Sequence, residues 1–386
     1  MVNFDQEINR TGTQSIKWDE INKMHNESGL LPLWIADMDF KAPEGVIDSY
    51  QKLLNHGIFG YTAASDDLFS ALINWEKKRY NLSLTTENIL LFTSVLAGIT
   101  TAIQTFTQAN DAVLIHDPVY PPFADIVKRN KRKLVRSRLI EEKGQFKMDF
   151  SDMEEKFKKQ NIKAFILCNP HNPGGRVWSK AELTQLGELC KKYHVIVLAD
   201  EIHQDLVFKP AEMTSFLTAG SFDDFAIKFT SVTKTFNLAG IKSAVAIVKN
   251  PALKTRLEQY QQMNFQHEVN TFGMVGMQAA YETGGEWLAE LLVYLKKNIA
   301  YTLEFFAENL PKVKIMQPEG TYLLWLDFSE YGLTDEALEN KLVHEGKVVL
   351  NPGISYGSGG AHHMRLNVAC PLKTLQAGLE RIKKCL

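Results

Sequence analysis

The alternation of short apolar runs with amphipathic helical patterns constrains the fold of this chain most strongly. The apolar runs, at 89–92, 112–116, 164–168, 195–199, 226–230 and 244–248, have the length and composition of buried strands. The segment between two of them begins with Ser179 and Glu182 in capping-box spacing and ends in basic residues, as a helix would. This order predicts a mostly parallel sheet covered by helices, in which ligands bind beyond the carboxyl ends of the strands.

The pattern changes from about residue 283, where a long amphipathic helical stretch is followed by strand-like runs at 322–326, 348–350 and 364–368. We therefore predict an α/β fold with two domains. Residues 41–282 would form a large domain around the mostly parallel sheet. Residues 283–386 would form a smaller α+β domain, to which we assign residues 1–40 because their periodicity is too weak for an independent fold.

The composition is that of an ordinary soluble globular protein, with 45% hydrophobic residues, 23% charged residues and a net charge of −2. A basic run at 128–138 lacks interleaved aromatic residues and indicates a solvated face, so no nucleic-acid partner is expected. The four cysteines contain no C-x-x-C pair, which favours reduced thiols, a cytoplasmic location and no metal site. An apolar leader and a stretch of ~18 apolar residues are both lacking, so no membrane partner is expected.

Three of the predicted strands run directly into polar residues suited to catalysis. Asn172 follows the strand at 164–168, Asp200 follows 195–199, and Lys234 follows 226–230. A lysine at a strand end can form a Schiff base, and pyridoxal 5′-phosphate supplies the necessary aldehyde. Asp200 could then keep the pyridine nitrogen of this cofactor protonated, while Asn172 could donate a hydrogen bond to its phenolic oxygen.

Further residues could bind the phosphate or the ring of the cofactor. Ser94 begins a predicted helix, whose N-terminal amides and dipole favour an anion. The remaining candidates are the backbone N–H groups of Val95 and Leu96, the hydroxyls of Ser231 and Thr233, and Tyr120, which could stack on the ring and is a candidate catalytic residue. Each residue also has an ordinary interpretation as a helix cap or turn, but their order at successive strand ends favours the cofactor site.

The segments SVLAG, PVYPPF, CNPHNPGG, ADEIHQD, SVTKTFNLAG and MRLNVACP follow one another along the chain. In this order they resemble the fold-type I pyridoxal-phosphate enzymes of the class I/II aminotransferase superfamily. The segments LPLWIADMDF, HGIFGYT and DEIHQDLV resemble most closely its cystathionine β-lyase (C–S lyase) branch, often called the MalY/PatB type. This resemblance covers essentially the whole chain. It implies a lyase that cleaves L-cystathionine or related S-substituted cysteines to a thiol, pyruvate and ammonia.

The resemblance also implies roles for individual residues. Arg365 would bind the α-carboxylate of an amino-acid substrate, with Ala36 as a further substrate-binding position. Tyr61 would reach across a dimer interface to the phosphate and substrate of the neighbouring subunit, which implies a homodimer with shared active sites. Two positions depart from many relatives. His203, which the resemblance places among the cofactor-binding residues, stands where aminotransferases often have a tyrosine, and Lys242 stands where they often have a phosphate-binding arginine.

Three alternatives to the lyase can be compared, and one of them stays open. The S-x-x-K sequence at 231–234 also occurs in β-lactamases, but the K-T-G element of those enzymes is lacking, since Thr235 precedes Phe236. An aminotransferase stays open, because both reactions begin when Lys234 removes the Cα proton. A binding or regulatory protein that retains the fold is disfavoured by the intact set of catalytic residues.

Overall fold

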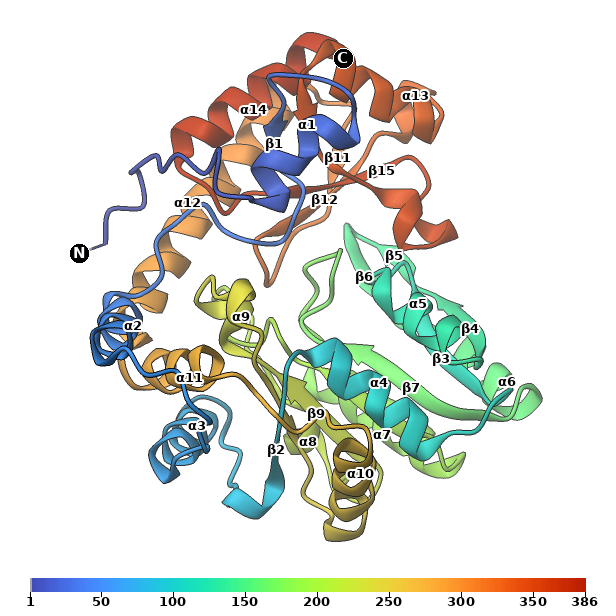
Figure 1. Cartoon of the computed structure of the whole chain (residues 1–386). Helices are drawn as coiled ribbons and strands as arrows, with labels where there is room; N and C mark the ends of the chain where they lie inside the picture. The colour runs from blue at the N-terminus through green and yellow to red at the C-terminus, as the bar shows by residue number, and fades with distance from the viewer. Residues whose placement is uncertain (1) are drawn as a thin grey trace.

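The computed structural model describes residues 2–386 and contains a seven-stranded sheet with helices packed on it and a four-stranded sheet near the C-terminus (Figure 1). The seven strands lie in the order β2-β10-β9-β8-β7-β3-β4. Their bounds are β2 (Ile89–Phe92), β3 (Ala112–Asp117), β4 (Lys133–Arg138), β7 (Ile162–Cys168), β8 (Ile196–Asp200), β9 (Ala226–Thr230) and β10 (Ala244–Ile247). Every strand predicted for the large domain is therefore present, with shifts of at most two residues at its ends.

The large sheet is mostly parallel, as predicted. β4, β3, β7, β8 and β9 run parallel, whereas β10 is antiparallel to both β9 and β2. The edge strand β4 was not predicted, because it occupies the second half of the basic run, which indicated a solvated face. Val135 and Ser137 point inward from β4, while Lys133 and Arg138 are exposed at its ends. An edge strand with charged residues is protected against pairing with another chain.

Helices connect the strands and continue into the C-terminal part. They are α1 (Ile21–Met24), α2 (Glu44–His56), α3 (Asp66–Tyr80), α4 (Val95–Phe106), α5 (Pro122–Arg129), α6 (Phe150–Lys159), α7 (Lys180–Lys192), α8 (Phe216–Ala219), α9 (Val232–Thr235), α10 (Pro251–Met263), α11 (Thr271–Thr283), α12 (Gly285–Asn309), α13 (Asp335–Asn340) and α14 (Leu372–Cys385). The capping box predicted for α7 is confirmed: the Ser179 hydroxyl accepts from the Glu182 amide, and the Glu182 carboxylate accepts from the Ser179 amide.

The small sheet is antiparallel and consists of β11 (Lys314–Ile315), β12 (Leu323–Asp327), β15 (His363–Asn367) and β14 (Asn351–Pro352), in that order. β1 (Leu31–Pro32) pairs in parallel with β13 (Val348–Val349), so the N-terminal segment lies against the C-terminal part of the chain (Figure 1). β5 (Ile140–Glu142) and β6 (Gln145–Lys147) form a separate hairpin. Because β1 is paired in this way, residues 34–36, which follow it, lie beside the carboxyl ends of strands in the large sheet.

Two large hydrophobic clusters fix these elements. One packs Ile99 of α4, Phe123 of α5 and Leu257 of α10 against Val113 and Ile166 of the large sheet. The other covers the opposite face of that sheet and continues into the small sheet and α14. All four cysteines are buried thiols outside any disulfide. Within residues 2–386, no helix has the length and apolarity needed to cross a membrane, and no group of three or more His, Cys, Asp and Glu side chains could hold a metal ion.

Candidate active site

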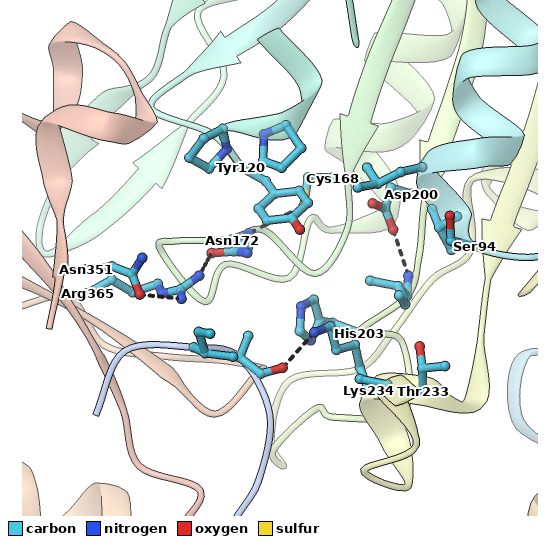
Figure 2. Close-up of a pocket in the computed structure, with 18 of the residues that line it drawn as sticks. Ser94, Tyr120, Cys168, Asn172, Asp200, His203, Thr233, Lys234, Asn351 and Arg365 are labelled. Carbon is cyan, nitrogen blue, oxygen red and sulfur yellow. Dashed lines mark hydrogen bonds between the residues drawn. The ribbon is translucent and has the colours of Figure 1, made fainter. Parts of the chain in front are cut away.

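A cavity of about 420 Å³ lies beyond the carboxyl ends of β7, β8 and β9, bounded on its other side by the small sheet and residues 34–36 (Figure 2). It brings together most of the residues singled out in the sequence. These are Ala36, Ser94, Val95, Leu96, Tyr120, Asn172, Asp200, His203, Thr233, Lys234 and Arg365. The cavity therefore lies where ligands bind in open α/β sheets.

Two predicted residues lie outside this cavity. Ser231 is buried, and its hydroxyl donates to the Ser243 carbonyl (2.6 Å) and accepts from the Thr233 amide (3.1 Å) as the N-cap of α9. The Ser231 hydroxyl therefore has two partners within this chain, and its part in the phosphate cradle stays a prediction. Tyr61 is fully exposed on the outer surface, so it contributes to no site within its own chain.

Lys234 follows β9 on the short helix α9 and points into the cavity (Figure 2). Its Nζ donates to the Ala36 carbonyl at 2.6 Å. Burial of the amine, together with the positive charge of Arg365, lowers the pKa of Lys234 to about 8, although Asp37 and Asp200 act in the opposite direction. With this pKa roughly a tenth of the amine is neutral at pH 7, far more than for a lysine with an ordinary pKa of about 10.4, and the neutral form is the nucleophile and proton acceptor.

Asp200 is the last residue of β8 and is almost completely buried. Burial raises the pKa of its carboxyl to about 7, opposed by a hydrogen bond from the Ile202 amide (3.0 Å) and by the charge of Lys234. A cationic group in the cavity would keep this carboxylate ionised, because an opposite charge at short range favours the charged form. The site thus favours a ligand with a protonated nitrogen at this end.

Arg365 of β15 reaches the cavity from the small sheet. Its Nη1 donates to Asn172 Oδ1 (3.1 Å), and its Nη2 donates to the Trp34 carbonyl (2.7 Å) and to Asn351 Oδ1 (3.0 Å). The guanidinium carbon lies 5.4 Å from the centre of the Tyr356 ring. Nε is buried and has no hydrogen-bond partner among the described residues. The planar guanidinium is therefore held in place while it keeps donor capacity for a carboxylate.

The opposite end of the cavity is suited to an anion. Ser94 is the N-cap of α4 and accepts a hydrogen bond from the Ala97 amide (3.1 Å), while Val95 and Leu96 begin the helix. The first amides of a helix lack intrahelical partners and carry a partial positive charge. Lys242 also lines the cavity and adds a cation. These groups together form a cradle of the kind that binds phosphate.

His203 and Tyr120 complete the polar lining. Burial, with the charges of Lys234 and Arg365, lowers the pKa of His203 to about 3, so the imidazole is neutral at ordinary pH. Its Nδ1 is buried and without a hydrogen-bond partner within residues 2–386. Burial raises the pKa of Tyr120, whose phenol is half-buried at the cavity wall. Both side chains remain available as neutral hydrogen-bonding groups or as ring contacts.

Sequence reasoning missed several lining residues, namely Trp34, Ile35, Thr93, Pro121, Pro122, Cys168, Ile202, Ala239, Ser243, Asn351 and Tyr356. Most of them adjoin motif residues and could have been found by their proximity in the sequence. Asn351 and Tyr356 carry no such signal. Asn351 reaches the site because β14 pairs with β15 in a register that sets it opposite Arg365.

Comparison with known protein families matches residues 29–382 to the family described as aminotransferase class I and II. The chain belongs to the class I and II aminotransferase family. Cystathionine beta-lyase PatB of Bacillus subtilis (strain 168) is 41% identical to this family member over 386 residues, which cover 100% of both chains. The family resemblance found in the motifs is therefore confirmed.

Two solved structures of similar proteins match this family member over its full length. Cystalysin from Treponema denticola, which contains a pyridoxal 5′-phosphate cofactor, gives a TM-score of 0.97 at 33% identity, with 100% of this chain and 98% of that chain covered. The PLP-bound C-S lyase from Staphylococcus hominis gives a TM-score of 0.93 at 33% identity with the same coverage. The predicted α/β fold of the family is thus confirmed.

Proposed function

We propose that this protein is a pyridoxal-phosphate-dependent carbon–sulfur β-lyase, which cleaves L-cystathionine or related S-substituted cysteines to a thiol, pyruvate and ammonia. The observation that carries the proposal is the convergence of Lys234, Asp200, Asn172 and Arg365 on one cavity. The full-length similarity to a cystathionine β-lyase and to the structure of a C–S lyase supports this reaction over others of the family.

The residues of the cavity fit the cofactor. Lys234 provides an amine with a lowered pKa for the aldehyde, and the buried Asp200 carboxylate suits a protonated pyridine nitrogen. The start of α4 and Lys242 suit the phosphate, and Asn172 suits the phenolic oxygen. When bound, the cofactor withdraws electrons from the substrate Cα and so makes its proton acidic.

The protein's own groups then bind the substrate and move its protons. Arg365 holds the α-carboxylate with the planar fork of its guanidinium, which Asn351 and the Trp34 carbonyl keep in orientation. Lys234 accepts the Cα proton and can return a proton to the departing sulfur. A general acid or base at such a position contributes about 10²–10⁴-fold to the rate. The Cβ–S bond breaks and the sulfur leaves with this proton as the thiol, which is the first product. Water then hydrolyses the remaining three-carbon fragment to pyruvate and ammonia.

Several further features belong to this proposal. The enzyme acts as a homodimer in the cytoplasm, with Tyr61 of one subunit reaching the site of the other. The full exposure of Tyr61 beside the exposed Ile58 and Phe59 supports an interface there, and the buried reduced thiols suit the location. Residues 41–282 form the cofactor-binding domain, and residues 1–40 with 283–386 form the smaller one. The separate sheets of the two parts support this division.

The purified enzyme should be incubated with a panel of S-substituted cysteines, including L-cystathionine, and in parallel with amino acids plus 2-oxoglutarate. We expect free thiol, pyruvate and ammonia in equal amounts without any added keto acid. Lys234→Ala is the control and should show none of these products. Amino transfer that depends on a keto acid, with thiol release at background, would identify an aminotransferase and refute the lyase.

A further inference from the structure

Residues 34–36 form the wall of the cavity opposite the sheet. They begin a segment without regular secondary structure, residues 34–40, which we call the wall segment. The carbonyl of Ala36 in this segment accepts hydrogen bonds from Lys234 Nζ (2.6 Å, Figure 2) and from the Tyr322 hydroxyl (2.9 Å). Within the described part of the chain, no strand ladder fixes these residues. The position of the Ala36 carbonyl therefore depends on the side chains that anchor the wall segment.

The strongest of these anchors is a charge cluster formed by Arg10, Lys17, Asp37 and Asp39. Asp39 accepts from Arg10 Nη1 (2.7 Å) and Lys17 Nζ (2.8 Å) and is almost completely buried. Asp37 pairs with Arg10 Nη2 (2.8 Å) and Lys17 Nζ (3.3 Å). Lys17 is only 1% exposed. Two cations thus balance two carboxylates directly behind the Ala36 carbonyl.

Two asparagines anchor the backbone of the same segment. Asn237 Nδ2 donates to the carbonyls of Met38 and Phe40, and Asn367 Nδ2 donates to those of Ile35 and Asp37. Asn237 lies shortly after Lys234 in the sequence, and Asn367 lies shortly after Arg365. The wall segment is consequently tied to both segments that carry charged residues of the cavity, and Asp37 keeps a fixed place relative to Lys234.

We propose that Asp37 is a positioning residue of the active site: with Arg10, Lys17 and Asp39 it forms a balanced charge cluster that controls how readily the free amine of Lys234 carries a proton. The proposal rests on the proposed function only in taking Lys234 as the proton acceptor. In this proposal, Arg10, Lys17 and Asp37 of the N-terminal segment influence the reaction although they do not line the substrate cavity.

The charged and titratable groups around Lys234 decide the expected direction. Arg365, Lys242 and a protonated His203 disfavour an ammonium at this position, whereas Asp200 and Asp37 favour it. Removing the charge of Asp37 leaves the cluster with a net positive charge, which lowers the pKa of Lys234. Removing the charge of Lys17 leaves it with a net negative charge, which raises that pKa.

This difference in sign separates an electrostatic role from a merely structural one. Loss of order in the wall segment would remove the Ala36 carbonyl as an acceptor and would lower the pKa of Lys234 in either variant. An electrostatic cluster instead predicts opposite shifts for Asp37→Asn and Lys17→Met. The double variant restores the balance of charge, since one cation and one carboxylate remain.

The experiment measures the titration of Lys234 in the full-length chain after the cofactor has been removed with hydroxylamine. Trace labelling with acetic anhydride across roughly pH 6 to 10, followed by peptide mapping, gives the midpoint for Lys234. An opposite charge at close range moves a pKa by about 1–3 units. Asp37 forms no direct hydrogen bond with Lys234 within residues 2–386, and the paired ions partly compensate one another, so we expect smaller shifts of about 0.5–1 unit. The midpoint should fall in Asp37→Asn, rise in Lys17→Met and return towards the wild-type value in the double variant.

Shifts in the same direction, or an unchanged midpoint in Asp37→Asn, would overturn the proposal. Circular dichroism and unfolding midpoints of each variant establish that the labelled chains are folded. If Lys17→Met fails to fold because its buried partners lose a cation, Arg10→Met replaces it, since Arg10 is partly exposed and its removal also leaves the cluster with a net negative charge. The midpoint should then rise in Arg10→Met and fall in Asp37→Asn. The measurement uses no substrate, so its outcome is independent of whether the enzyme is a lyase.

Discussion

The buried charges beneath the active site give the sharpest prediction for stability. Lys228 of β9 lies between Glu76 of α3 and Glu201, which follows Asp200 directly, and the side chains of Lys228 and both glutamates are 0% exposed. Lys228 Nζ is 2.6 Å from Glu76 Oε2 and 3.2 Å from Glu201 Oε2. The lysine therefore joins the two strands that carry catalytic residues to a helix on one side of the sheet.

Lys228→Met keeps most of the side-chain volume but leaves two buried carboxylates without a cation. Breaking a buried ion pair from one side costs about 3–5 kcal/mol. A second argument gives a similar value. A glutamate that stays buried without a cation binds a proton, and for an ordinary pKa of about 4.3 this protonation costs about 3.7 kcal/mol at pH 7 and about 1 kcal/mol at pH 5. The loss of stability should therefore reach at least about 3 kcal/mol at pH 7 and decrease by about 1.4 kcal/mol per pH unit for each protonated carboxylate.

The sign follows from the protons that each state binds. In the variant, the folded state keeps a proton that the unfolded state has released above about pH 4.3, so raising the pH favours unfolding. Urea unfolding at fixed protein concentration, at pH 7 and pH 5, measures this difference. Lys159→Met, at an exposed ion pair with Glu155, is the matched control and should leave the midpoint unchanged. A Lys228→Met protein as stable as the wild type at pH 7, or a loss that is the same at both pH values, would refute the reasoning.

Three further predictions concern the site, the core and the assembly. Asp200→Asn should lower kcat and kcat/KM together, by about 10²–10³-fold, while unfolding of the cofactor-free protein stays unchanged; an unaltered kcat would remove Asp200 from the mechanism. Burial lowers the pKa of His116 to about 3, so the stability of the wild type should fall as the pH drops from about 6.5 towards 3. His116→Phe should weaken this pH dependence in acid unfolding curves, and an equal dependence of stability on pH in wild type and variant would contradict the prediction. Mixing the inactive variants Tyr61→Ala and Lys234→Ala should restore activity through hybrid dimers, and an active monomer in light scattering would exclude the shared site.

The sequence predicted those parts of the fold and site that depend on local patterns. The buried strands carry uninterrupted apolar runs, and polar residues at their carboxyl ends converge because parallel strands end at one edge of the sheet. Lys234, Asp200 and Asn172 were found in this way. Strand β4 was not predicted, because its charged residues are typical of a surface segment, although its residue Val135 is buried.

Residues that reach the site through tertiary structure could not be predicted. Asn351 depends on antiparallel register, and Tyr356 depends on packing against Arg365. Ser231 illustrates a related limit, since a hydroxyl near a reactive lysine can also serve as a helix cap. Sequence spacing shows that a polar group is close, but the competition among its hydrogen-bond partners decides where it points.

A common physical arrangement connects these observations. The segments that carry Asn172 and Lys234 begin where a strand ends, so the ladder of backbone hydrogen bonds that fixes the strand does not extend to them. Buried polar side chains hold these segments instead, as when Asp205 accepts from the Thr235 hydroxyl next to Lys234 (2.8 Å) and from the Trp75 indole (3.0 Å). The low polarity of the protein interior strengthens such hydrogen bonds and ion pairs when every group has its partner. It makes the loss of one partner costly, because the other group stays buried and unpaired. Substitutions at these buried residues should therefore impair activity as strongly as many catalytic substitutions, although these residues do not line the cavity. A measurement such as the titration of Lys234 distinguishes the loss of a catalytic group from the loss of the contacts that hold it in place.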